Sequence, residues 1–352
     1  MVPTRQTPAR GSRRARFAQW FGAALGALFA TGCAETQSAL DPHGPAADAI
    51  ARIGWIMFAG AAVVAGVVFY LLLRPVLHAW RRPQPAAVVV EEGSTRLIVW
   101  GSVLTTAVLI ALFSGTMLTL ASIAAPYAAG TLELEVIGHQ WWWEVRYRHP
   151  DTGRTVTTAN EIHIPVGRAV RVAVRSDDVN HSFWVPRLHG KIDMLPGRTN
   201  RIVLEAAEPG LYPGACSEFC GLQHANMRLL VIAEPPEEFT RWLDWQAGPA
   251  LPPTDALTRQ GQQVFIQAGC VFCHTFRTAP GPSPAPGGAI APDLTHIGSR
   301  RTLGAGMIPN TPRHLQDWIA DAPARKPGIR MPAMDLDGPS LQALAAYLEG
   351  LR

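Results

Sequence analysis

The segment that decides the fold is Cys216-Ser217-Glu218-Phe219-Cys220-Gly221-Leu222-Gln223-His224-Ala225-Asn226-Met227. It places two thiols, an imidazole and a thioether within twelve residues, and His181 stands upstream. Thiolate and thioether are soft ligands and imidazole suits copper, so the set favours copper over calcium or magnesium. One cysteine with two histidines and a methionine would form a mononuclear blue-copper site. The second cysteine, four residues later, allows two sulfurs to bridge two metal ions that share one electron.

Two simpler interpretations of this segment are a Cys216–Cys220 disulfide and a structural zinc site. Neither accounts for Met227 or for the distant His181. The sequence therefore favours a dinuclear, redox-active copper site.

The residues around this segment have the pattern of a β domain. From Thr131 to Ala233 the chain consists of short runs of β-type residues with turn residues between them. The clearest runs are residues 132–136, 169–175, 201–204 and 228–232. About a hundred residues of this kind indicate a β-sandwich or barrel, and we place this domain at residues 130–245.

Two apolar segments precede the β domain in a chain that is 48% hydrophobic and only 16% charged. Residues 53–73 and 97–123 contain no charged side chain, and each exceeds the roughly 20 residues that a helix needs to cross a bilayer. A pair of buried core helices is the alternative, but such helices seldom run this long without a charge. We therefore predict a transmembrane hairpin over residues 45–125.

The charges flanking the hairpin predict its orientation. The connecting loop carries four arginines: Arg74, Arg81, Arg82 and Arg96. By the positive-inside rule this loop is cytoplasmic. Both ends of the hairpin, and everything after Pro126, then lie on the periplasmic side. A net charge of +4, with arginines near the N-terminus and the apolar runs, does not favour nucleic-acid binding.

The first 33 residues resemble a targeting segment. Five arginines precede an apolar run at residues 17–30, which is too short to span a membrane and ends in small residues. Ala30-Thr31-Gly32-Cys33 resembles a bacterial lipoprotein cleavage site, with Ala30 where a leucine is usual. We predict a signal peptide at residues 1–33, with Cys33 as a candidate lipid-carrying residue. Cleavage without lipidation and an uncleaved tail are the alternatives.

The C-terminal part of the chain is predicted to be helical. A proline-rich linker at residues 246–254 leads into residues 255–352, where the helical segments are residues 258–268, 314–321 and 340–351. Cys270-Val271-Phe272-Cys273-His274 is a c-type haem attachment motif. Cys270 and Cys273 can form thioethers with the haem vinyl groups while His274 binds the iron. A zinc site would need a second ligand pair at short spacing, and a redox pair would not need the histidine.

Taken together, these motifs resemble subunit II of a haem-copper cytochrome oxidase with a fused C-terminal cytochrome c domain, as in caa-type oxidases. The resemblance spans roughly residues 45–352. It implies a multidomain chain: a two-helix transmembrane hairpin, a cupredoxin-like β-barrel and an all-α cytochrome c domain. The segment 216–227 is similar to the signature of the dinuclear CuA centre. The CuA ligands that the resemblance implies are Cys216 and Cys220 as bridges, His181 and His224 as caps, Met227 as a weak ligand and the backbone carbonyl of Glu218.

Further stretches match the same family. Gly138-His139-Gln140-Trp141-Trp142-Trp143-Glu144 resembles its aromatic patch, in which Trp141 takes the position that accepts the incoming electron. Residues 191–198 resemble a segment that lies over the catalytic subunit, and the carboxylate of Glu218 is expected to reach a magnesium ion shared with subunit I.

One departure from the family concerns proton uptake: Leu97 stands where many members carry a glutamate. Glu91 or Glu92 is the candidate substitute, and the role is not carried over.

The second axial ligand of the haem iron is expected to be a methionine, which raises the reduction potential relative to a second histidine. Lys326-Pro327-Gly328-Ile329-Arg330-Met331-Pro332 resembles the family's ligand loop, so we predict Met331. Met334 and then Met307 are the alternatives.

The resemblance implies an electron-transfer subunit of a cytochrome c oxidase in the bacterial inner membrane. Electrons would pass from an external donor through haem c to the CuA centre and on to subunit I, which reduces oxygen. The implied partners are subunits I and III, membrane lipid, and a soluble or membrane cytochrome c or a bc complex as donor. One rival is the electron-accepting subunit of a CuA-containing nitric oxide reductase. The other, from a different class, is a membrane-tethered copper-binding or assembly protein, which leaves the haem motif unexplained.

Overall fold

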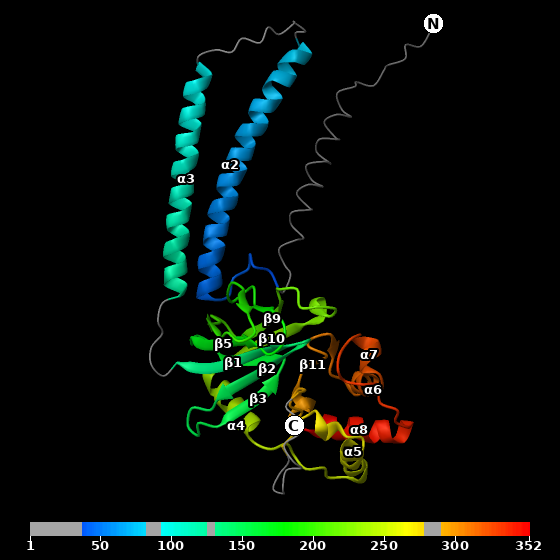
Figure 1. Cartoon of the computed structure of the whole chain (residues 1–352). Coiled ribbons are helices and arrows are strands. Elements are labelled where there is room, and N and C mark those ends of the chain that lie inside the picture. The colour runs from blue at the N-terminus through cyan, green and yellow to red at the C-terminus, as the bar shows by residue number, and fades with distance from the viewer. Residues whose placement is uncertain (1–36, 82–92, 125–130, 278–289) are drawn as a thin grey trace, which may run out of the picture.

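The computed structural model describes residues 37–81, 93–124, 131–277 and 290–352. Two long helices are followed by a β domain and then by a helical domain (Figure 1). The predicted order of the three parts is confirmed. The predicted signal peptide at residues 1–33, with Cys33, lies outside the described residues, and so do Glu91 and Glu92.

Helices α2 (Pro45–Arg81) and α3 (Gly93–Ile123) contain the two predicted spans. They run beside each other away from the β domain (Figure 1). Both are long and apolar enough to cross a membrane, and neither apolar stretch is buried within the protein. Exposed apolar surface on this scale is costly in water and is suited to lipid. The alternative of buried core helices is therefore wrong.

The start of α2 is attached to the β domain. The backbone N–H of His43 donates to the carbonyl of Arg187 at 2.7 Å, and the N–H of Ala207 donates to the carbonyl of His43 at 2.8 Å. The next residue, Gly44, lies so close to the segment before Ala207 that a Cβ there would be 2.3 Å from the carbonyl oxygen of Glu205. Only glycine permits this approach, so the hairpin is joined to the β domain by a tight backbone contact.

The β domain is a sandwich of two five-stranded sheets. The first has the order β3-β2-β1-β5-β8, and its strands are β1 (Leu132–His139), β2 (Trp142–Arg148), β3 (Thr155–Ala159), β5 (Val170–Ser176) and β8 (Asn200–Leu204). The second has the order β4-β10-β9-β6-β7, and its strands are β4 (Glu161–Pro165), β6 (His181–Trp184), β7 (Ile192–Met194), β9 (Gly210–Cys216) and β10 (Arg228–Glu234).

Alternation of side chains explains these strands. In β5 the residues are buried and half-buried in turn, with Val170, Val172 and Val174 fully inside. The two runs predicted from alternation, residues 132–136 and 169–175, correspond to β1 and β5, and the further β-type runs 201–204 and 228–232 fall in β8 and β10. Helix α4 (Pro236–Ala247) was not predicted; it packs on β3, β4 and β10, and its Trp242 stacks on His163 at a ring distance of 3.9 Å.

The helical domain contains α5 (Ala256–Gln267), α6 (Pro312–Ala320), α7 (Ala322–Arg325) and α8 (Gly338–Gly350), with a short hairpin of β11 (Thr302–Leu303) and β12 (Ile308–Pro309). The three predicted helical segments fall in α5, α6 and α8. Helices α5 and α8 cross at Gly261, where a Cβ would be 2.0 Å from the carbonyl oxygen of Ala343. The predicted linker, residues 246–254, includes the end of α4 and the turn before α5, and the domain limits themselves stay a prediction.

The helical domain is docked on the β domain (Figure 1). The buried carboxylate of Glu161 accepts hydrogen bonds from the backbone N–H groups of Arg301 and Thr302, at 2.7 and 3.2 Å. The backbone N–H of Arg228 donates to the carbonyl of Ala305 at 3.1 Å. These contacts place the helical domain against the end of the sandwich that carries the segment 216–227.

Candidate metal centre and haem cavity

Strand pairing brings the predicted copper ligands together from two distant parts of the chain. His181 begins β6 and Cys216 ends β9, and these strands are antiparallel neighbours with Phe183 opposite Cys216. The N–H of Cys216 donates to the carbonyl of Met227 at 2.9 Å, which closes the loop before β10. The sandwich therefore fixes both ends of the ligand loop.

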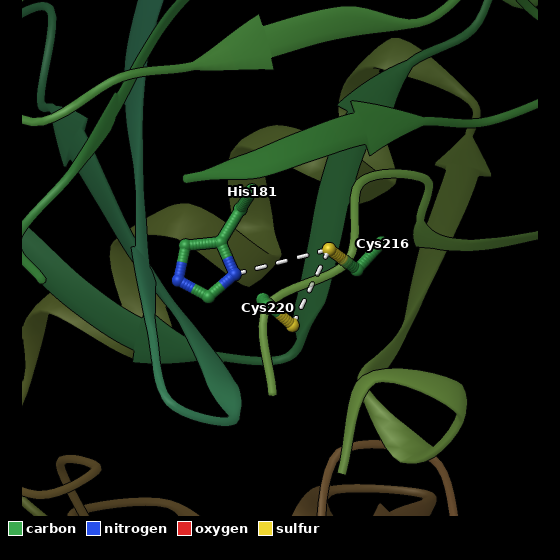
Figure 2. Close-up of side chains that lie close together, drawn as sticks. All are labelled: His181, Cys216 and Cys220. Atoms are coloured by element: carbon green, nitrogen blue, oxygen red, sulfur yellow. Dashed lines mark hydrogen bonds between the residues drawn. The ribbon is translucent and has the colours of Figure 1, made fainter. Parts of the chain in front are cut away.

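The side chains converge at one end of the sandwich. Figure 2 shows the imidazole of His181 facing the two sulfurs, and the ligand atoms of His181, Cys216 and Cys220 lie within 4.8 Å of one another. The Sγ of Cys216 lies 3.8 Å from the Sγ of Cys220 and 3.8 Å from His181 Nδ1. The remaining candidates surround the pair: Cys220 Sγ is 3.6 Å from His224 Nδ1 and 3.8 Å from Met227 Sδ, and Cys216 Sγ is 3.2 Å from the carbonyl oxygen of Glu218.

This donor set fits copper. Two sulfurs at the centre, two imidazole nitrogens and a thioether are the soft and intermediate ligands that copper prefers, and a backbone carbonyl oxygen can add a weak further ligand. Hydrogen bonding to the neighbouring thiol of Cys220 and to His181 outweighs burial and lowers the pKa of Cys216 below the ordinary value of a thiol. The thiolate is the form of cysteine that binds metals, so Cys216 is suited to that role.

Asp178 orients His181, and sequence reasoning gave it no role. Its Oδ1 lies 2.9 Å from His181 Nε2, so it accepts the Nε2 proton and leaves Nδ1 directed at Cys216. The same carboxylate accepts backbone N–H groups from Gln140 and Val179, both at 2.6 Å. Burial raises the pKa of Asp178, but these bonds outweigh it and hold the pKa below its ordinary value. A carboxylate three residues before a histidine ligand was the signal available in the sequence, since such partners commonly fix the ring of a metal ligand.

A second site is a cavity of about 280 Å³ that the helical domain forms with the β1–β2 end of the sandwich. Cys270, Cys273 and His274 line it together with Met331 and Met334. Most of the other lining residues are apolar, among them Phe265, Leu294, Ile297, Trp318, Leu344 and Leu348. Two thiols, an imidazole and thioethers around an apolar space fit a covalently attached haem.

The imidazole of His274 is held for ligation. Its Nδ1 lies 2.7 Å from the carbonyl oxygen of Pro292, so Nδ1 carries the donated proton and Nε2 is free. Burial lowers the pKa of His274 below its ordinary value, which favours the neutral form that binds iron. Cys270 and Cys273 stand in the turn formed by the 3-10 helix Cys270–Phe272, which follows Gly269 at a φ of 77°.

Two of the three candidate axial methionines lie at the cavity. Met331 and Met334 both line the cavity, whereas Met307 is not among its lining residues. Met334 also packs on the core of the helical domain, and its backbone N–H donates to the carbonyl of Ala320. Met331 therefore stays the prediction, with Met334 as the alternative.

Trp141 lies between the two sites. Its side chain lines the haem cavity, and its indole Nε1 donates to the carbonyl oxygen of Cys220 at 2.9 Å. Only 8% of its surface is exposed, because the helical domain covers it. The predicted electron-accepting tryptophan is thus in contact with both sites and shielded from solvent.

A membrane-anchored chain with clustered copper-type ligands on a β-sandwich and a c-type haem motif on a docked helical domain belongs to the membrane-bound electron-transfer proteins. Residues 149–234 match the family description "Cytochrome C oxidase subunit II, periplasmic domain", and residues 258–352 match "Cytochrome c". The chain belongs to the cytochrome c oxidase subunit 2 family. It is accordingly a subunit of an oxidoreductase complex, with a cupredoxin-like domain and a cytochrome c domain that imply copper and haem binding.

Several relatives carry the same description. Cytochrome c oxidase subunit 2 of Alkalihalophilus pseudofirmus is 35% identical over 337 residues, which cover 92% of this chain and 94% of the relative. That of Bacillus sp. strain PS3 is 30% identical over 277 residues, covering 74% and 76%. Among solved structures, the periplasmic domain of subunit II of cytochrome oxidase of Bradyrhizobium japonicum is 33% identical, with coverage of 34% of this chain and 95% of that one and a TM-score of 0.31.

Proposed function

We propose that this chain relays electrons from an external donor, through a covalent haem c and a dinuclear CuA centre, to the haem-copper subunit I that reduces oxygen to water. The observation that carries the proposal is the position of Trp141. Its ring lines the cavity of the haem motif while its N–H binds the carbonyl of Cys220. Two sites of one-electron chemistry that share a residue are suited to passing electrons within one chain.

In this proposal the copper pair is held by the cluster around Cys216 and Cys220. His181 lies beside the sulfur of Cys216 and His224 lies beside the sulfur of Cys220. The thioether of Met227 and the carbonyl of Glu218 complete the set. The pair would supply one-electron redox chemistry with the charge shared between two metals. The protein keeps these ligands in a fixed arrangement through β6 and β9, so little has to rearrange on transfer.

Haem c is proposed to be attached at Cys270 and Cys273, with His274 and Met331 as axial ligands. Attachment within the same chain keeps the haem beside the copper domain, so transfer between the two sites does not depend on diffusion. The bound haem would supply one-electron iron chemistry. Subunit II itself would form and break no bonds of oxygen.

The membrane part is proposed to be a hairpin with a cytoplasmic loop, and the copper and cytochrome domains to lie on the periplasmic side of the bacterial inner membrane. Support comes from the arginines of the loop and from the attachment of α2 to the β domain. The exposed side chain of Glu218 is free to reach a magnesium ion shared with subunit I. Subunit III, and a cytochrome c or bc complex as donor, are the further partners that we propose.

The test is spectroscopy of the purified full-length chain, oxidised and then reduced, with copper and iron quantified. We expect two copper ions and one iron per chain, a c-type α-band on reduction, and a near-infrared copper band that bleaches. Haem without the near-infrared band would show that the segment 216–227 does not form a CuA centre. Oxygen consumption and nitric oxide reduction by the whole complex would separate an oxidase from a nitric oxide reductase.

A further inference from the structure

Lys326 is one of the two lysines in this chain, and it is almost completely buried, with 2% of its surface exposed. Its ammonium group donates to three backbone carbonyls: that of Trp141 at 2.8 Å, that of Asn226 at 2.8 Å and that of Gly304 at 2.7 Å. The three N–H donors of the side chain are therefore all used. No carboxylate forms an ion pair with it in the part of the chain that the structure describes.

A buried ammonium is expensive unless its bonds are well made. Burial lowers the pKa of Lys326 to about 7, which reflects the cost of keeping the charge inside. A methionine of similar length would fill the same space without this cost, as replacements of buried charges by apolar residues commonly do. The presence of lysine thus points to a need for the three bonds themselves.

The three carbonyls belong to three segments that meet at the junction of the two domains. Trp141 stands between β1 and β2, and Asn226 directly precedes the copper-ligand candidate Met227. Gly304 follows β11 in the helical domain. Lys326 itself stands at the start of the segment that leads to Met331, so one side chain bonds the haem-ligand segment to the copper loop and to Trp141.

The residues after Lys326 continue this junction. The carbonyl of Pro327 accepts a hydrogen bond from the side-chain amide of Gln223 at 2.9 Å. Gly328 has a φ of 88°, which favours glycine, and it lies against the copper domain: a Cβ there would be 3.2 Å from Leu222 Cδ2 and 3.4 Å from the Trp141 ring. Ile329 packs against the core of the β domain. From Lys326 to Ile329 the chain is therefore fitted to the copper domain.

We propose that Lys326 is a positioning residue for haem-to-copper electron transfer: it fixes the Met331 segment against Trp141 and the copper loop, and so holds the separation of the two centres constant. This inference rests on the proposed function, since it presupposes both centres. The step moves one electron, oxidising the haem iron and reducing the copper pair, and no bond forms or breaks. Lys326 also lines the edge of the haem cavity, but its three donors are all used on backbone carbonyls, so in this proposal it ligates neither centre and acts through the segments that it joins.

The kinetic test uses the purified, metal- and haem-loaded full chain. Haem c is reduced by a light pulse with a photochemical reductant, and its reoxidation by the copper pair is followed. K326M removes all three donors, and K191M, at the exposed second lysine, is the matched control. We expect transfer in K326M to slow several-fold, because loss of the three bonds frees the Met331 segment to shift away from Trp141 and the copper loop. K326Q, whose amide can make two of the three bonds, should be intermediate, and K191M should equal the wild type.

The static properties distinguish positioning from general damage. A positioning role leaves the copper and iron contents, the absorption bands and both midpoint potentials of K326M unchanged while the transfer rate falls. Wild-type kinetics in K326M, or a rate loss that follows entirely from shifted potentials, would overturn the proposal.

A second measurement needs no variant. In the wild-type chain an amine-reactive reagent, followed by mass spectrometry, should modify Lys191 rapidly and leave Lys326 protected until the chain is denatured. The lowered pKa would make Lys326 the more reactive amine if it were accessible, so protection reports burial in the junction. Modification of both lysines at similar rates would refute the junction even where K326M fails to fold. Absence of copper or haem from the wild type would instead contradict the proposed function.

Discussion

The indole Nε1 of Trp141 donates a hydrogen bond to the carbonyl oxygen of Cys220 at 2.9 Å. The same oxygen accepts a second bond, from the side-chain amide of Gln140 at 2.8 Å. Because Trp141 also lines the cavity that carries the haem motif, this bond joins the surroundings of that cavity to the backbone of the copper-ligand loop. The indole N–H of Trp141 supplies this donor, which a phenylalanine ring would lack.

We predict that W141F slows electron transfer from haem to copper. Phenylalanine preserves a buried ring but lacks the N–H, so the bond to Cys220 is lost. The transfer rate should fall several-fold, because the contact between the ring and the copper loop is lost, and stability should fall by about 1 kcal/mol. The measurement is the light-pulse experiment on the loaded chain. W142F is the matched control, since Trp142 also lines the cavity but stacks on His139 instead; equal rates in the two variants would contradict the prediction.

We predict that D178A weakens copper binding. Without the carboxylate the hydrogen bond that holds Nε2 of His181 and directs Nδ1 towards the sulfurs is lost, and copper affinity should fall by about 10- to 100-fold, as for other residues that orient metal ligands. Competition with a copper chelator, followed by the near-infrared band, measures the affinity. D177A removes the neighbouring carboxylate, which pairs with Arg175 on the surface, and should leave the affinity unchanged. A chelator curve for D178A that overlays the wild type would rule out this role.

The choice between two methionines can be tested directly. We predict that M331L removes the weak red absorption band of a methionine-ligated ferric haem and lowers the haem potential, because a thioether ligand raises it. M334L, which replaces the other methionine that lines the cavity, should retain the band. The opposite pattern would assign Met334 as the ligand. The haem itself should stay attached in both variants, since Cys270 and Cys273 are untouched.

Local sequence patterns predicted much of this fold because their causes are local. Cys216, Cys220, His224 and Met227 lie within twelve consecutive residues, so a short sequence motif identifies all four. The alternating pattern of β5 is likewise local, because it arises from one buried face of a single strand. Helix α4 was missed although Pro236 at its first turn, followed by Glu237 and Glu238, is a typical helix start.

The junction of the two domains could not be predicted in this way. Lys326 binds backbone carbonyls, which every residue carries, so no side-chain pattern marks its partners. Its separation from Trp141 is 185 residues, and only the docking of the domains brings the two together. Asp178 is an intermediate case: it is close to His181 in sequence, but its role depends on the direction of the imidazole ring.

The acid stability of the β domain should depend on Glu144, which is 6% exposed. Its carboxylate accepts hydrogen bonds from Arg146 Nε at 2.6 Å and pairs with His139 at 3.2 Å. Burial raises its pKa, but the bonds from His139 and Arg146 outweigh burial and bring the pKa below its ordinary 4.5. The folded chain therefore binds this proton less tightly than the unfolded chain does. The stabilisation is present above pH 4.5 and is lost as the pH falls through the lower folded value.

We predict that E144Q lowers the thermal midpoint of the β domain at neutral pH, by an amount equivalent to roughly 1–2 kcal/mol, and that the difference from the wild type shrinks below pH 4.5. The midpoint is measured on the full chain across this pH range through loss of the near-infrared copper band. E133Q is the control, because Glu133 forms an exposed ion pair with Arg171, and such pairs contribute little. A difference between E144Q and the wild type that is the same at every pH would show that the charge of Glu144 is not what stabilises the fold.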